Sequence, residues 1–64
     1  MQSKIRLLRK GRGLRQLDLA LSAGLSQATI WNVEHGLEIS RPTKQKIAAA
    51  LGVRVNDLFD HVEK

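Results

Sequence analysis

The chain has 64 residues, enough for one small domain, and carries a net charge of +5 with a pI near 10.5. It has no cysteine, so disulfides and thiolate metal sites are excluded and a hydrophobic core must supply the stability. No apolar run approaches the roughly 20 residues of a membrane-spanning helix, and the composition fits a cytoplasmic protein.

The first predicted helix spans residues 3–10. Ser3 can cap it, Ile5 and Leu8 lie one turn apart, and Gly11 follows its end. The basic residues of this segment lack the long apolar stretch of a secretory signal. An amphipathic transit peptide is the weaker interpretation, because Ile5 and Leu8 are needed for the core.

The second and third predicted helices span residues 15–22 and 26–35, and a short turn containing Gly24 joins them. The second turns three small or apolar residues inward: Leu19, Ala20 and Ala23. The third begins at Ser26, a suitable cap. It has little to bury, because only Ile30 and Val33 mark an apolar face.

The fourth predicted helix begins near Ser40, tolerates Pro42 in its first turn and ends at Gly52. Its buried side is formed by Ile47, Ala48 and Leu51. A last short helix, residues 55–61, places Leu58 and Phe59 inward. No segment alternates as a strand does, so the predicted class is all-α, with five short helices in one compact domain covering residues 1–64.

The apolar positions of these helices and their connecting loops form one predicted core. Its members are Ile5, Leu8, Leu14, Leu19, Ala20, Leu25, Ile30, Val33, Ile47, Leu51, Val53, Leu58 and Phe59. The polar side chains of the second and third helices are then free for binding.

Two short helices joined by a glycine-containing turn are typical of the helix-turn-helix unit, whose second helix lies in the DNA major groove. The amides of Gln27 and Asn32 can each form two hydrogen bonds to adenine, and Ala28 and Thr29 can contact the thymine methyl. Basic residues crowd the amino-terminal part of the chain, as a polyanionic partner requires. We therefore predict that these four residues contact bases.

The chain closely resembles the Cro/phage-repressor type of helix-turn-helix proteins, also called XRE-like. The resemblance rests on IRLLRKGRGL, on LRQLDLALSAGLSQATIWNVEHG and on KIAAALGVRVNDLF, which together cover almost the whole chain. The positions that match the family pattern in register are Leu14, Gln16, Leu19, Ala20, Gly24, Leu25, Ser26, Ile30, Val33, Glu34, Gly36, Ile47, Ala48, Ala50, Leu51, Gly52, Val53, Leu58 and Phe59.

The resemblance implies a role for several polar residues. Gln16 matches the glutamine that bonds a phosphate and braces the first residue of the recognition helix, and Glu34 matches a glutamate that braces the following loop. Gln27, Ala28 and Asn32 fall at the base-reading positions, with Thr29 near a phosphate or a base. The implied phosphate contacts are Arg9, Arg12, Arg41 and Lys44.

Some positions depart from the family pattern. Arg15 stands where a Ser or Thr usually caps the second helix, so that helix either frays at its start or uses Arg15 on a phosphate. Leu7, Leu17 and Leu21 stand at usually polar positions, and Leu17 and Leu21 lie one turn apart. One interpretation is that these leucines are apolar residues scattered singly over the surface. The other is that they form a protein interface that includes Trp31. For Trp31, packing against the loop before the fourth helix is as plausible, and a base or sugar contact is the third choice.

The sequence contains no catalytic constellation or metal-ligand spacing, so we expect no enzyme, no cofactor and no metal. His35 fits a helix carboxyl terminus and His61 fits solvent. The expected function is transcriptional regulation, by repression, through double-stranded DNA bound as a homodimer. The alternative is a protein-interaction module on the same scaffold, such as an antitoxin or a transcription adaptor. A membrane-surface protein fits less well, because the charge does not lie opposite one broad apolar face.

Overall fold

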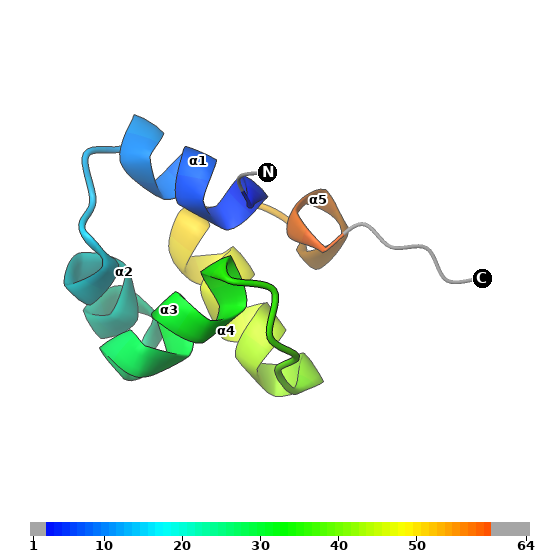
Figure 1. Cartoon of the computed structure of the whole chain (residues 1–64). Helices are drawn as coiled ribbons and strands as arrows, with labels where there is room; N and C mark the ends of the chain where they lie inside the picture. The colour runs from blue at the N-terminus through cyan, green and yellow to red at the C-terminus, as the bar shows by residue number, and fades with distance from the viewer. Residues whose placement is uncertain (1–2, 60–64) are drawn as a thin grey trace.

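The computed structural model describes residues 3–59, which fold into five helices and no strand, as the sequence predicts. They are α1 Lys4–Gly11, α2 Gln16–Ala23, α3 Gln27–Glu34, α4 Arg41–Leu51 and α5 Val55–Leu58. Figure 1 shows α4 in the middle of the molecule, with α1 above it and α2 to its left. The last helix ends at Leu58, earlier than predicted; residues 60 and 61 of the predicted helix lie outside the described part of the chain.

Three of the helices begin at serine caps, as predicted. The side-chain oxygens of Ser3, Ser26 and Ser40 accept hydrogen bonds from backbone amides three residues further on, at 3.0, 3.1 and 3.4 Å. Each serine satisfies one of the amides that a helix start leaves without an intrahelical partner. The positions of these serines therefore fix where α1, α3 and α4 begin.

The other two helices, α2 and α5, have arginines, Arg15 and Arg54, at their N-caps. For α2 the structure shows an arrangement that differs from the two expected, a frayed start or a cap replaced by a phosphate contact. The carboxylate of Asp18 accepts the backbone amide of Arg15 at 2.8 Å, and that of Asp57 accepts the amide of Arg54 at 3.0 Å. An acidic residue in the first turn also suits the positive end of the helix dipole. The carboxylate three residues on replaces the missing Ser or Thr at each helix start.

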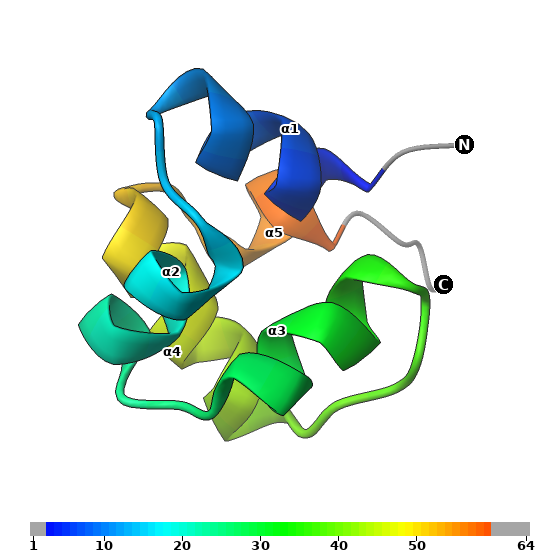
Figure 2. The same cartoon turned by 60° about the vertical axis from the view of Figure 1, so that its left-hand side comes forward.

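The turn between α2 and α3 depends on Gly24. This residue has φ +71° in the left-handed region, which residues with a Cβ rarely adopt. The reversal lets the amide of Leu25 donate to the carbonyl of Ala20 at 2.9 Å, which closes the end of α2. Because the turn is so short, α2 and α3 pack directly on one another (Figure 2).

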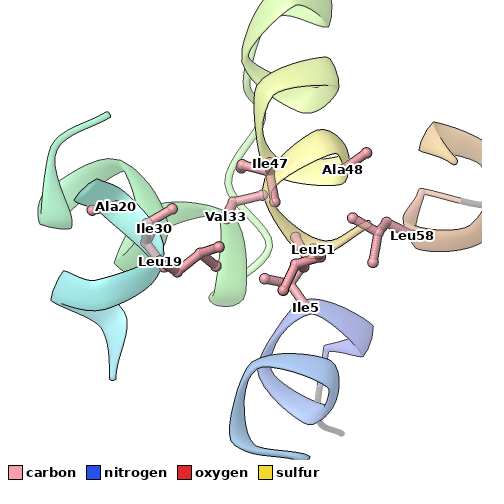
Figure 3. Packing of buried hydrophobic residues seen from close by; sticks show 9 residues of the cluster. All are labelled: Ile5, Leu19, Ala20, Ile30, Val33, Ile47, Ala48, Leu51 and Leu58. Atoms are coloured by element: carbon pink, nitrogen blue, oxygen red, sulfur yellow. The ribbon is translucent and has the colours of Figure 1, made fainter. Parts of the chain in front are cut away.

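One hydrophobic cluster holds the five helices together (Figure 3). The second half of α4 carries Ile47, Ala48 and Leu51, and the other helices converge on it with Ile5, Leu19, Ala20, Ile30, Val33 and Leu58. The predicted core is thus confirmed at its centre. Five predicted members are only partly buried around it: Leu8, Leu14, Leu25, Val53 and Phe59. Because α4 supplies the surface on which α2 packs, it fixes the α2–α3 pair indirectly.

Candidate nucleic-acid interface

Helix α3 has a buried side and an open side. Ile30 is completely buried and Val33 is 8% exposed, whereas Gln27, Ala28 and Trp31 are exposed. The exposed residues are three and four positions apart, so they lie along one strip of the helix. Asn32 lies at the edge of this strip and is half-buried. The predicted base-contacting residues Gln27, Ala28 and Asn32 therefore share one accessible side of α3.

Thr29 lies in a different environment. Its hydroxyl is 2.9 Å from that of Ser26, and its amide donates to the Ser26 oxygen at 3.1 Å. The side chain is half-buried beside the helix cap, away from the strip of Gln27 and Ala28. Thr29 thus strengthens the start of α3, and its hydroxyl is already engaged.

A buried ion pair connects α1 to the end of α3. Arg9 Nε donates to Glu34 Oε2 at 2.6 Å and Nη2 donates to Oε1 at 3.0 Å, a two-pronged pair with exposed side-chain fractions of only 7% and 1%. The remaining terminal nitrogen of Arg9 donates to the Leu14 carbonyl at 2.9 Å. Gln16, the first residue of α2, donates its amide to Glu34 Oε1 at 3.2 Å. Residues of three helices therefore meet at one carboxylate, and Arg9 also ties the α1–α2 loop to this point.

This geometry corrects three expectations for polar residues. Arg9 is buried and bound to Glu34 and Leu14, so it is not a surface cation available to phosphate. Glu34 braces α1 and α2 rather than the loop after α3. Gln16 directs its amide to Glu34, the last residue of α3, where we expected it to brace the first.

The environment of Glu34 favours its ionised form. Burial alone would raise the pKa of this carboxyl group, but the hydrogen bonds from Arg9 and Gln16 and the charges of Arg9 and Arg6 outweigh burial. The pKa of Glu34 therefore lies below its ordinary value. The negative charge of α3 is compensated inside the protein and is withdrawn from the open face.

An open cleft of about 640 Å³ lies beside the start of α3. Its lining joins the end of α1, the following loop and the starts of α2 and α3: Arg9, Lys10, Gly13, Leu14, Arg15, Gln16, Leu17 and Gln27. Lys10 and Arg15 are exposed there, beside the amides of Gln16 and Gln27. The cleft thus places cationic and amide donors next to the open strip of α3.

Lys10 was not among the phosphate contacts that the sequence indicated. It belongs to the basic amino-terminal cluster, and nothing in its local pattern distinguishes it from its neighbours. Its accessibility depends on the fold, through the inward course of its neighbour Arg9. Once Arg9 turns inward to Glu34, the next residue of the helix turns toward the cleft.

The other predicted phosphate contacts are in varied settings. Arg12, at the end of α1, and Arg41, at the start of α4, are exposed. The Lys44 ammonium lies over the Phe59 ring, 5.3 Å from its centroid. Arg15 is exposed and pairs with Asp18 at 3.1 Å, and hydrogen bonds from Arg15 lower the pKa of that carboxyl group. A phosphate at Arg15 therefore has to share it with Asp18.

The apolar residues that departed from the family pattern are exposed but do not lie on one helix. Leu7 is on α1, Leu17 and Leu21 are on α2, and Trp31 is on α3, with exposed fractions of 56%, 42%, 71% and 48%. Leu17 lines the basic cleft, and Leu7 lines a separate apolar hollow between α1 and α5. The neighbour that fixes the ring of Trp31 is His35, the residue that ends α3, with centroids 3.7 Å apart.

The described residues, 3–59, contain no group of three His, Asp or Glu side chains placed to hold a metal ion. None of the helices within that range is long and apolar enough to span a bilayer.

The topology, the left-handed turn at Gly24 and the open side of α3 together define a helix-turn-helix unit. A family model described as Helix-turn-helix matches residues 5–58. The chain belongs to this family, of the Cro/repressor type. No curated protein matches the chain. The matched range of this helix-turn-helix protein begins in α1 and ends with α5, so it includes the whole described core.

The Arg9–Glu34 pair gives a stability prediction. Replacing Arg9 alone with Met leaves a buried carboxylate without its cation, and we expect a loss of about 3–5 kcal/mol in unfolding free energy. Adding Glu34→Leu should recover most of the loss, because the uncompensated charge is gone. Urea unfolding of the single and double variants measures both values. A double variant no more stable than Arg9→Met would show that the pair is not the cause.

The lowered pKa of Glu34 predicts acid sensitivity. Its ordinary value is 4.5, and the folded-state value is lower, so the pair's contribution is complete well above pH 4.5. The contribution is lost as pH falls from that value through the folded-state pKa. Thermal unfolding between pH 7 and pH 3 should show this decline in the wild type and much less of it in Arg9→Met with Glu34→Leu. Glu38→Gln, which removes an exposed carboxylate outside the pair, serves as the control; an equal decline in the double variant would contradict the assignment.

Proposed function

We propose that this helix-turn-helix protein is a sequence-specific, double-stranded DNA-binding regulator that represses transcription. The observation that carries the proposal is the open strip of α3, which presents Gln27, Ala28 and Asn32 beside a cationic cleft. In the major groove, the two amides match adenine and Ala28 matches the thymine methyl. The only acid of α3, Glu34, is buried and compensated, so it does not repel DNA.

The cleft and the adjacent cations would supply the backbone contacts. Lys10 and Arg15 are exposed at the cleft, and Arg12 and Arg41 are exposed near the ends of α1 and α4. Phosphate contacts fix the position of a protein on the duplex, whereas base contacts select the sequence. This division assigns affinity to the cations and selectivity to α3.

We propose a homodimer as the functional form. One helix of eight residues reads only a few base pairs, and a two-fold dimer doubles the recognised site. The half-sites would lie about 34–36 Å apart, one turn of the duplex. Repression then needs no chemistry, no cofactor and no metal, because occupancy of a promoter is itself the regulatory event. We accordingly propose a cytoplasmic location and no enzymatic activity.

Selection of bound sequences from a random pool of duplex DNA tests the proposal. We expect one enriched site made of two related half-sites. Replacing Gln27 and Asn32 together with Ala should abolish the enrichment while non-specific binding persists, since each lost two-bond contact removes about 1–3 kcal/mol of discrimination. Circular dichroism of the variant checks that its helices are retained.

A failure of the wild type to enrich any site would favour the alternative, a protein-interaction module. The observation that supports this alternative is the exposure of Leu21, which is 71% accessible on α2 and lies outside the cleft. A partner that docks there should be released by Leu21→Glu. Leu17 is a poorer probe, because it also lines the cleft and a charge there would disturb both functions.

The cationic cleft predicts a salt dependence that one residue should alter. Removing one phosphate contact lowers the slope of log affinity against log salt by about 0.9. Lys10→Ala should therefore flatten the slope by this amount and weaken binding to all duplexes alike. Lys46→Ala, an exposed lysine outside the cleft, is the matched control and should leave the slope unchanged. Equal slopes for wild type and Lys10→Ala would remove Lys10 from the interface.

A further inference from the structure

The second half of the open face of α3 is covered by a fixed aromatic pair. The rings of Trp31 and His35 are stacked, with centroids 3.7 Å apart and planes inclined by 16°. Nδ1 of His35 is 2.7 Å from the Trp31 carbonyl oxygen, and since that oxygen can only accept, Nδ1 carries the proton. The pair is thus held both by ring contact and by a hydrogen bond, while 48% of Trp31 stays exposed.

The pair continues the strip that begins with the amides. Trp31 follows Gln27 by four residues and Ala28 by three, and His35 follows Asn32 by three. Residues at these spacings are neighbours on one side of a helix. If the first half of this strip lies in the major groove, Trp31 enters it as well, and a large apolar ring must meet the edges of base pairs.

We propose that the Trp31–His35 stack is a specificity-determining element that contacts the 5-methyl group of a pyrimidine. The inference rests on the proposed function. The edges of base pairs in the major groove display hydrogen-bonding groups, and the one apolar group among them is the methyl of thymine. A ring placed over the polar edges would leave them without partners, which is unfavourable, whereas contact with a methyl buries apolar surface on both sides. 5-Methylcytosine presents the same group at the same position.

His35 has a positioning role in this arrangement. An exposed Trp side chain loses rotational freedom when it binds, and that loss weakens the contact. Because His35 covers one side of the indole and is itself tied to the Trp31 carbonyl, the ring is already ordered before DNA arrives. The free side of the ring is the part that can meet a methyl group.

The experiment scans the enriched site by replacing each thymine with uracil, which removes only the methyl group. We expect one position per half-site to lose about fourfold in affinity, the equivalent of one buried methyl-sized group. In Trp31→Ala, uracil at that position should no longer weaken binding, whereas Trp31→Phe should keep most of the fourfold loss. In His35→Ala, where the ring is left unordered, the affinity lost with uracil should lie between the values for the wild type and for Trp31→Ala. A loss equal to that of the wild type would show that His35 has no part in the element.

Leu37→Ala is the matched control, because Leu37 is 52% exposed and lies outside α3. It should keep the full uracil effect. At the same position, 5-methylcytosine should bind about fourfold better than cytosine, because it carries the same methyl group, and an equal affinity would contradict recognition of the methyl.

The outcomes separate this inference from the proposed function. The role of the stack is overturned if an enriched site exists but no uracil replacement lowers its affinity, or if the losses are identical in wild type and Trp31→Ala. Either result leaves operator binding intact. A wild-type protein that enriches no site overturns the proposed function, and the inference with it.

Discussion

The structure depends on a single carboxylate, that of Glu34, at the point where three helix ends meet. Glu34 is the last residue of α3, where the negative end of the helix dipole disfavours an acid. Its partners offset this: Arg9 comes from the last turn of α1, where a cation is favoured, and Gln16 opens α2, whose positive end faces an acceptor. The cation of α1 and the amide at the positive end of α2 therefore compensate the charge at the end of α3.

This joint explains how a helix with so little apolar surface keeps a fixed orientation. Packing alone would anchor α3 through Ile30 and Val33 on one side, which leaves rotation about that contact weakly restrained. The two-pronged bond to Arg9 adds a directional restraint at the far end of the helix. The opposite side of α3 is then free to carry residues chosen for a partner, and the acid of the helix is kept away from that side.

The sequence predicts most of the fold because its helix limits are local. Serine caps, glycines at the carboxyl ends of helices and the spacing of apolar residues all lie within a few residues of each boundary. The predicted helices therefore match those observed to within a residue or two, apart from α5. The polar site was harder to predict, because its assignments depend on contacts between distant segments. Arg9 and Glu34 are 25 residues apart, and nothing in either neighbourhood shows that they pair. Two similar arginines, Arg9 and Arg12, consequently end in opposite environments, one buried and one exposed. The resemblance placed Gln27, Ala28 and Asn32 in register, and their common exposure follows from burial of the other side of α3.

The two halves of the open face differ in the kind of selectivity that they can provide. An amide that becomes buried against the wrong base loses its hydrogen bonds and leaves polar groups without partners, so Gln27 and Asn32 can reject a mismatch strongly. An apolar ring that meets the wrong base loses only the burial of a methyl-sized group. Discrimination by the Trp31–His35 stack must therefore be weaker than discrimination by the amides, and its gain depends on the ring being ordered beforehand. The hydrogen bond from His35 to the backbone of the residue it stacks on provides that order within the recognition helix itself, with no contact from the rest of the fold required.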